Sequence, residues 1–336
     1  MRDLEKRLIK PEFWQDTVIA QNSLQELFYL IFCEQEQYRE WLTLLNDIQA
    51  GLELLESESN EELEWELIAN FDYLSRELKH VEILNLLHQP FDDKGTFITI
   101  TAGNNDVDSQ DWVNMLLRMY CRWCDRHEYK LRLVEELWGE WGGFNCVSLE
   151  ISGKYAYGYL KSEQGIHQLK RISPFCKKPR IKTSFAKVEV IPIVDESMDF
   201  YIPEQDLEIY LKPTPVISNR QFVLAKVTHI PTGISVTCTE ERNQLANLEK
   251  ALAIVKSKLF SLMQSQGVPL SDIKKPSSKN VANNPIREYI FDPYQKVKDL
   301  RTDVETTAIA QVMKGNLDLF IKAYLKQHFA KSRYQC

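Results

Sequence analysis

The chain has 336 residues, of which 44% are hydrophobic and 26% charged, a composition typical of a globular protein with room for two or three domains. It has no run of eighteen apolar residues, so no transmembrane helix is predicted, and its seven scattered cysteines do not form a disulfide framework and indicate a reducing compartment. The first 100 residues carry 21 acidic and 8 basic side chains, whereas the other 236 carry a net charge of +6. The net positive charge of residues 101–336 indicates an anionic partner for this part of the chain.

Residues 1–90 are predicted to be helical. Apolar side chains recur there every three or four residues, acidic residues occupy the other faces, and Gly and Pro are nearly missing. The pattern predicts a helical hairpin or a small bundle. We place the end of this N-terminal helical domain at residue 94, within the turn Gln89–Gly95.

The rest of the chain alternates between strand-like and helix-like patterns, so the predicted fold class is α+β multidomain. A domain at 95–205 has one helix, at about 110–128, and strands at 96–101, 129–135, 147–151, 156–160 and 184–194. A domain at 206–272 has strands at 207–210, 226–230 and 234–238 and a helix at about 243–264. A C-terminal segment, 273–336, has a strand at 286–291, a loop at 298–302 and a helix at about 315–330. We expect this segment to pack back on the second domain.

The most unusual stretch is 169–185, where six of seventeen residues are Lys or Arg and none is acidic. Ser173-Pro174-Phe175 is expected to hold a hydroxyl group and an aromatic ring out on a tight loop, because Pro174 fixes φ. Cations around a presented ring suit a phosphate backbone with unstacked bases, although a solvated basic loop is the alternative. The candidate RNA-binding residues here are Lys170, Arg171, Ser173, Pro174, Phe175, Lys177, Lys178, Arg180 and Lys182.

Other chemically active patterns are sparse. Cys121 and Cys124 form a Cys-x-x-Cys, and with Cys176 they are candidates for a redox response, but no second ligand pair follows. The sequence shows no carboxylate pair, nucleophile triad, phosphate loop or metal cluster, so neither a metal nor another cofactor is predicted. His167 and His229 are expected to be structural hydrogen-bonding groups.

Several motifs follow one another in a fixed order. They are Ser109-Gln110-Asp111-Trp112, Ser152-Gly153-Lys154-Tyr155, Gly165-Ile166-His167, Ser173-Pro174-Phe175, Thr183-Ser184-Phe185, Thr228-His229-Ile230-Pro231-Thr232-Gly233 and Lys298-Asp299-Leu300-Arg301-Thr302. From about Leu4 to the C-terminus the chain resembles the bacterial-type class I peptide chain release factors of type 2, the PrfB family. The resemblance implies the release-factor α+β domains, the ribosome as a partner, and peptidyl-tRNA hydrolysis at UGA and UAA codons.

One departure from the family concerns hydrolysis. Family members carry a Gly-Gly-Gln loop whose Gln backbone amide assists the attack of water on the peptidyl-tRNA ester. Thr214-Pro215-Val216 stands at that place, and Pro215 has no amide hydrogen and cannot adopt positive φ. We therefore expect no catalytic residue and no hydrolysis by the family's mechanism.

Other departures concern codon recognition. Ser173-Pro174-Phe175 is kept, but Lys182 replaces the family's stacking His, and Lys178-Pro179 replaces a flexible Gly pair. Glu163 matches an acidic position of the family and is a candidate reader of a base edge. Asn105-Asp106-Val107-Asp108 replaces a Gly-Gly-Thr-Glu turn and is expected to alter only the surface. These replacements predict a site retuned towards generic RNA binding.

The resemblance extends to land-plant plastid members of the family that lack the Gly-Gly-Gln loop and stabilise a plastid transcript through its 3′ untranslated region. It implies this role here, as a monomer in a ribonucleoprotein complex in the plastid stroma, with no membrane partner. The segment Met1–Glu5 is neither a signal peptide nor a transit peptide, so a targeting segment would lie outside this sequence. Alternatives are the mitochondrial matrix or bacterial cytoplasm, a working termination factor, and a ribosome-associated factor without catalysis.

Overall fold

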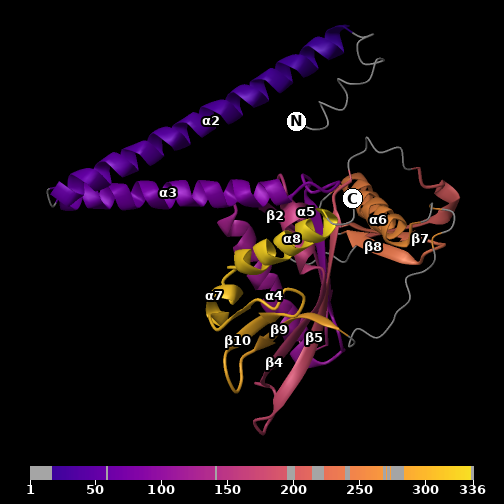
Figure 1. Ribbon diagram of the computed structural model, residues 1–336. Coiled ribbons are helices and arrows are strands. Elements are labelled where there is room, and N and C mark those ends of the chain that lie inside the picture. The colour runs from indigo at the N-terminus through magenta and orange to yellow at the C-terminus, as the bar shows by residue number, and fades with distance from the viewer. Residues whose placement is uncertain are drawn as a thin grey trace. The chain divides into compact units, whose positions relative to one another are not determined.

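The computed structural model describes residues 17–57, 60–140, 142–194, 201–213, 223–238, 243–267, 270, 273 and 284–333 (Figure 1). Contacts within the chain divide it into two compact units, Met1–Leu84 and Asn85–Cys336. The mixture of an N-terminal helical region with α+β architecture after it confirms the predicted fold class.

The N-terminal unit is built from two long helices, α2 (Thr17–Ser57) and α3 (Glu61–Leu86), as the apolar periodicity predicts. Asn60 caps α3, since its Oδ1 accepts hydrogen bonds from the backbone N–H of Glu62 at 3.0 Å and of Leu63 at 3.3 Å. A small core of Ile48, Leu67 and Leu74 joins the two helices into a hairpin.

The second unit contains an eight-stranded sheet with the order β11-β10-β9-β4-β5-β1-β3-β2 (Figure 1). All neighbouring strands are antiparallel except β4 and β9, which are parallel. The three C-terminal strands extend the sheet beside β4. The strands are β1 (Thr96–Ala102), β2 (Lys130–Trp138), β3 (Phe144–Ser152), β4 (Gly165–Ile172), β5 (Ile181–Pro192), β9 (Pro285–Ile290), β10 (Lys296–Asp299) and β11 (Glu305–Thr306).

Helix α4 (Val107–Arg126) packs one apolar face on this sheet. It begins three residues before the predicted start because the side chain of Asp106 accepts a hydrogen bond from the backbone N–H of Ser109 at 2.8 Å and caps the helix. Trp112 is fully buried, and its Nε1 donates to the backbone carbonyl of His167 at 3.0 Å. This bond ties the helix to β4.

The predicted strand at 156–160 is wrong, because these residues form the short helix α5 (Ala156–Leu160). The alternation of Tyr with small residues imitates a strand, but the preceding Tyr155 has φ +67° and turns the chain. The backbone N–H of Gly158 donates to the carbonyl of Asp92 at 3.2 Å, and a Cβ at Gly158 would lie 2.7 Å from that oxygen. The close approach to this turn requires glycine and a compact helical segment.

The C-terminal residues differ from prediction at three places, one of which is the short strand β11 (Glu305–Thr306), where no element is predicted. Lys298 and Asp299 belong to β10 rather than to a loop, since Lys298 pairs with Glu288 in the ladder. A short helix, α7 (Ile309–Met313), was not predicted and precedes α8 (Asp318–Arg333).

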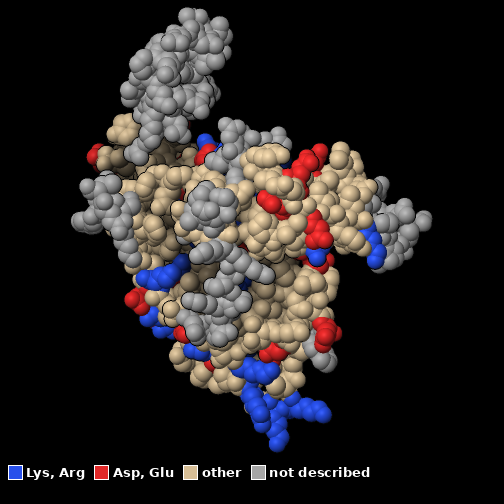
Figure 2. Space-filling view, turned by 90° about the vertical axis from the view of Figure 1, so that its right-hand side faces the viewer, with Lys and Arg blue, Asp and Glu red and all other residues tan. Residues whose placement is uncertain are grey.

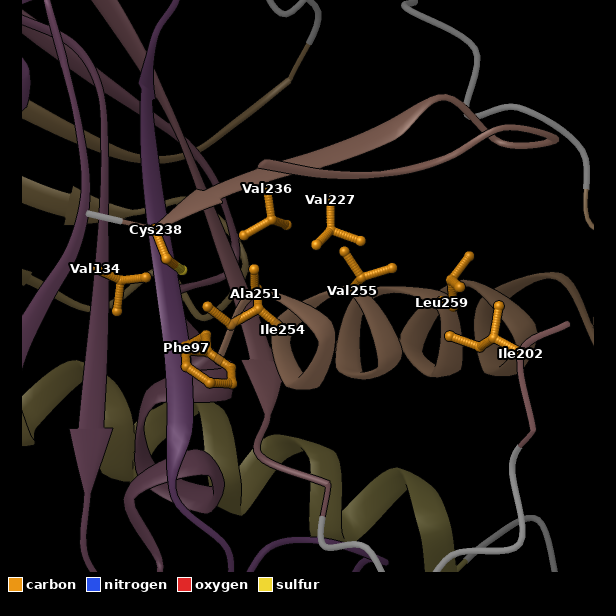
Figure 3. Close-up of a cluster of buried hydrophobic side chains, with 10 residues drawn as sticks. All are labelled: Phe97, Val134, Ile202, Val227, Val236, Cys238, Ala251, Ile254, Val255 and Leu259. Carbon is orange, nitrogen blue, oxygen red and sulfur yellow. The ribbon is translucent and has the colours of Figure 1, made fainter. Parts of the chain in front are cut away.

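A second, three-stranded sheet has the order β6-β7-β8 and is covered by α6 (Gln244–Gln266). Figure 3 shows the apolar cluster between them, with Val227 and Val236 of the sheet facing Val255 of the helix, and with Phe97 of β1 and Val134 of β2 at one end. The strands are β6 (Leu207–Pro213), β7 (Val223–His229) and β8 (Ile234–Cys238). One apolar core therefore joins this layer to the eight-stranded sheet.

Within the described part of the chain, no helix combines the length and apolar character needed to span a membrane. In the same residues no group of three or more His, Cys, Asp or Glu side chains is arranged to hold a metal ion.

Candidate nucleic-acid interface

The predicted basic loop is the tip of the β4–β5 hairpin. Ile172 pairs with Ile181 at the end of the ladder, and the backbone N–H of Ser173 donates to the carbonyl of Arg180 at 3.1 Å. The loop proper is therefore shorter than 169–185, because residues up to 172 and from 181 belong to strands. We call residues 174–180 the hairpin tip.

The hairpin tip presents cations and one aromatic ring to solvent. Phe175 is 52% exposed, and Pro174, Lys177, Lys178 and Arg180 are also exposed. Figure 2 shows Lys and Arg side chains gathered at the bottom of the view, at the height where Figure 1 places this hairpin. None of the three cations forms an ion pair with any described residue.

The base of the hairpin is organised by one buried carboxylate. Asp108, at 1% exposure, accepts a hydrogen bond on Oδ2 from Ser173 Oγ at 2.9 Å and from Lys182 Nζ at 2.8 Å. Arg171 lies 3.6 Å from its other oxygen. Burial raises the pKa of Asp108, but the hydrogen bonds and charges of Lys182, Ser173 and Arg171 outweigh it, so the pKa lies below its usual value. The carboxylate is ionised at neutral pH.

Several predicted RNA-binding residues are therefore engaged within the protein. The expectation that Ser173 presents its hydroxyl group on the loop is wrong, because the side chain is buried and donates to Asp108. Arg171 also binds Asp111 at 2.5 Å and lies 5.9 Å from the centre of the Phe175 ring. Lys170 pairs with Glu288 at 3.3 Å. The expectation that the segment ending at Asp108 alters only the surface is wrong, because Asp108 joins α4 to both strands of the hairpin.

Glu163 must be withdrawn as a candidate reader of a base edge. Its side chain is fully buried, and its two oxygens bind Arg287 at 2.7 and 2.8 Å. Burial raises the pKa of Glu163, but the charge and hydrogen bonds of Arg287 together with the influence of His167 and Arg301 outweigh burial, so the pKa lies below its usual value. No surface remains on this residue for a nucleotide.

Sequence reasoning missed the rest of this buried network. Arg287 also binds Asp299 at 3.1 Å, and Asp299 binds Arg301, whose NH2 group donates to the backbone carbonyl of Ser162 at 2.6 Å. The run Lys298-Asp299-Leu300-Arg301-Thr302 was the available signal. The network fastens the C-terminal strands to the short helical turn Lys161–Glu163, which comes just before β4.

Both predicted structural histidines make hydrogen bonds inside the fold. His167 Nε2 lies 2.9 Å from the carbonyl of Glu163, and Nδ1 lies 3.3 Å from Tyr289 Oη. Burial lowers the pKa of His167 to about 4, so the ring is neutral at physiological pH. His229 Nδ1 lies 2.8 Å from Thr232 Oγ1.

Two family domains match the chain, the PCRF domain over residues 1–188 and the RF-1 domain over residues 219–301. The chain is 38% identical over 338 residues to "Peptide chain release factor PrfB1, chloroplastic" of Arabidopsis thaliana, covering 97% of this chain and 73% of that protein. It belongs to the PrfB-type class I peptide chain release factors. "Peptide chain release factor 2" of Chloroflexus aggregans is 36% identical over 340 residues, which cover 99% of this chain and 92% of that protein. Among solved structures, RF2 of Thermus thermophilus matches with a TM-score of 0.71 and 30% identity, and the match covers 97% of this chain and 93% of that chain.

In this release-factor homologue, the position of the family's catalytic loop lies outside the described residues. Thr214-Pro215-Val216 falls between β6, which ends at Pro213, and β7, which begins at Val223. The expectation about hydrolysis therefore continues to rest on the chemistry of Pro215 in the sequence.

The candidate redox cysteines of this release-factor homologue have different surroundings. Burial raises the pKa of Cys124 to about 12, and burial also raises that of Cys121, its neighbour on α4. Both thiols are free and protonated at neutral pH, the form that reacts slowly. Cys176 lies in the hairpin tip and is half-buried.

Proposed function

We propose that this release-factor homologue has lost peptidyl-tRNA hydrolysis and binds single-stranded RNA through the hairpin tip, stabilising a plastid mRNA through its 3′ untranslated region. The observation that carries the proposal is the set of exposed cations Lys177, Lys178 and Arg180, which have no ion-pair partner among the described residues. Beside them stands the exposed ring of Phe175. Phosphate attraction combined with base stacking is the ordinary way to hold single-stranded RNA.

The arrangement at the base of the hairpin supports sequence-tolerant binding. Ser173 donates its hydroxyl hydrogen to Asp108, and Lys182 is paired with the same carboxylate. Lys182 also lacks the flat ring of the family's His and cannot stack on a base. These residues hold the hairpin in place, while the tip makes the contacts with RNA.

Loss of hydrolysis is supported by the residues at the catalytic loop position. Pro215 stands where the family needs a flexible glycine, and Val216 stands at the place of the family's Gln. A plastid location is supported by the chloroplastic relative of Arabidopsis thaliana. The protein acts as a monomer within a ribonucleoprotein complex.

RNA binding in increasing salt tests the proposal. Changing Lys177, Lys178 and Arg180 together to Ala removes three phosphate contacts and lowers the salt slope for single-stranded RNA by about two units. The matched control changes Lys187, Lys296 and Lys298 to Ala, since each of these is already paired with a carboxylate. If the variant with Lys177, Lys178 and Arg180 changed binds RNA as tightly as the unchanged protein, the hairpin tip is not the RNA-binding surface.

The choice of RNA is tested separately. Plastid 3′ untranslated RNAs are expected to bind more tightly than scrambled RNAs of the same length and composition. Equal affinity for both would contradict the role in stabilising a particular transcript. Sequencing of RNA crosslinked to the native protein identifies the target directly.

The second candidate function is translation termination at UGA and UAA codons. Ser173-Pro174-Phe175 is retained, and the relative of Chloroflexus aggregans carries the name of release factor 2. Release of formyl-methionine from ribosomes programmed with UGA decides between the two. Any stop-codon-dependent hydrolysis contradicts the proposed loss of catalysis.

A further inference from the structure

A second exposed aromatic residue lies beside the hairpin tip. Tyr294, in the turn between β9 and β10, is 58% exposed. It comes from a part of the sequence more than a hundred residues away from Phe175, and the RNA-binding candidates of the sequence do not include it.

The sheet brings this turn and the hairpin tip to the same edge. Because β4 and β9 are parallel neighbours, both strands end at this edge (Figure 1). Lys170 pairs with Ile290 there. Neighbouring strands lie about 4.8 Å apart. The backbone N–H of Phe291 donates to the carbonyl of Lys170 at 2.8 Å, and that of Ile172 donates to Asp292 Oδ2 at 3.0 Å. These bonds fasten the turn to the hairpin.

Two apolar side chains are exposed at this edge of the sheet. Ile172 and Ile181 pair across the ladder and are 44% and 59% exposed. Two aliphatic side chains and two aromatic rings at one edge form an exposed apolar strip, and the unpaired cations of the hairpin tip adjoin it. The neighbouring acidic groups are engaged, since Glu288 pairs with Lys170 and Asp292 accepts from Ile172.

We propose that Tyr294 is a second base-stacking residue, so that a single RNA strand lies across Ile172 and Ile181 with bases on Phe175 and Tyr294. The cations of the hairpin tip then hold phosphates on one side of the strip. This inference rests on the proposed RNA-binding function. An RNA strand fits better than a protein partner because two exposed aromatic rings stand at the same edge as three unpaired cations, the combination that suits bases and phosphates together.

The test measures the affinity of oligouridine 12-mers for the full chain. Tyr294→Ala is expected to weaken binding about tenfold with an unchanged salt slope, because a stacking ring is lost and no phosphate contact is. Tyr294→Phe keeps the ring and is expected to bind like the unchanged protein. The control is Tyr201→Ala, since Tyr201 is 77% exposed and belongs to another part of the chain. Thermal melting confirms that each variant is folded.

The affinities of these variants distinguish failure of the second stacking site from failure of the proposed RNA-binding function. If Phe175→Ala weakens binding but Tyr294→Ala matches the Tyr201→Ala control, the second stacking site is wrong and the hairpin tip still binds RNA. If Phe175→Ala and the triple cation variant both bind as the unchanged protein does, the proposed function itself fails. Crosslinking with 4-thiouridine RNA provides an independent readout, and the absence of a crosslinked peptide containing Tyr294 overturns the inference.

Discussion

Asp108 and Lys182 form an ion pair of 2.8 Å in which the carboxylate is 1% exposed and the lysine side chain 42% exposed. The pair joins the first turn of α4 to the start of β5, and Ser173 reaches the same carboxylate from the end of β4. A single acidic side chain thus holds both sides of the hairpin. Lys182 acts mainly as an anchor for the hairpin rather than as a free cation.

Asp108→Ala should therefore loosen the hairpin. The variant leaves the buried hydroxyl of Ser173 without its partner, and we expect a loss of about 1–3 kcal/mol in the free energy of unfolding, measured in urea. Faster hydrogen exchange is expected at the backbone N–H of Ser173. Glu305→Ala is the control, because its carboxylate is 51% exposed and solvent screens its ion pair with Lys296. Equal losses in the two variants would contradict the anchoring role.

Glu163→Ala should be among the most destabilising single changes in the second unit. It leaves the fully buried Arg287 with only Asp299 to balance its charge, and breaking such a pair costs about 3–5 kcal/mol. Urea denaturation measures this loss. Glu163→Gln should lose less, since it keeps the shape and one hydrogen-bond acceptor. Glu305→Ala, at an exposed ion pair with Lys296, serves as the control, and a similar effect there would count against the prediction.

His167 should make the protein less stable in mild acid. The pKa of the ring is about 4 in the folded protein and about 6.5 when unfolded, so between these values the unfolded chain binds more protons. Stability is therefore complete above pH 6.5 and falls as the pH drops towards 4. We expect a loss of about 2 kcal/mol between pH 7.5 and pH 5. In His167→Gln this part of the pH dependence should disappear. Urea denaturation of both proteins at pH 7.5 and pH 5 measures the two losses in the free energy of unfolding.

Cys121 and Cys124 should be poor redox sensors. Burial raises the pKa of Cys124 to about 12, so almost none of the reactive thiolate is present at pH 8. Limited alkylation of the native protein, followed by peptide mapping, should leave Cys124 unmodified and label Cys121 slowly. The denatured protein is the control, in which both react. A disulfide between the two under mild oxidant would contradict this prediction.

Most elements of the fold follow from local patterns. Apolar repeats of three and four residues predict α2, α3, α4 and α6, because one face of each helix must be buried. The helix α5 does not follow, because its sequence has a strand-like alternation and its backbone hydrogen bonds to the turn at Asp92 require a helical segment instead. A local pattern contains no information about such a partner distant in sequence.

For the candidate site, too, some features follow from the sequence alone and others depend on contacts between distant segments. The sequence is sufficient to locate the excess of cations around Ser173-Pro174-Phe175 and to indicate the family, since both depend only on which residues are present. Whether a side chain is free to bind RNA depends on its neighbours in space. Packing decides that Glu163 is buried against Arg287, that Asp108 holds Lys182, and that a turn from the C-terminal strands places Tyr294 beside the hairpin. Charge and hydrogen-bond satisfaction act between segments that only the folded sheet brings together.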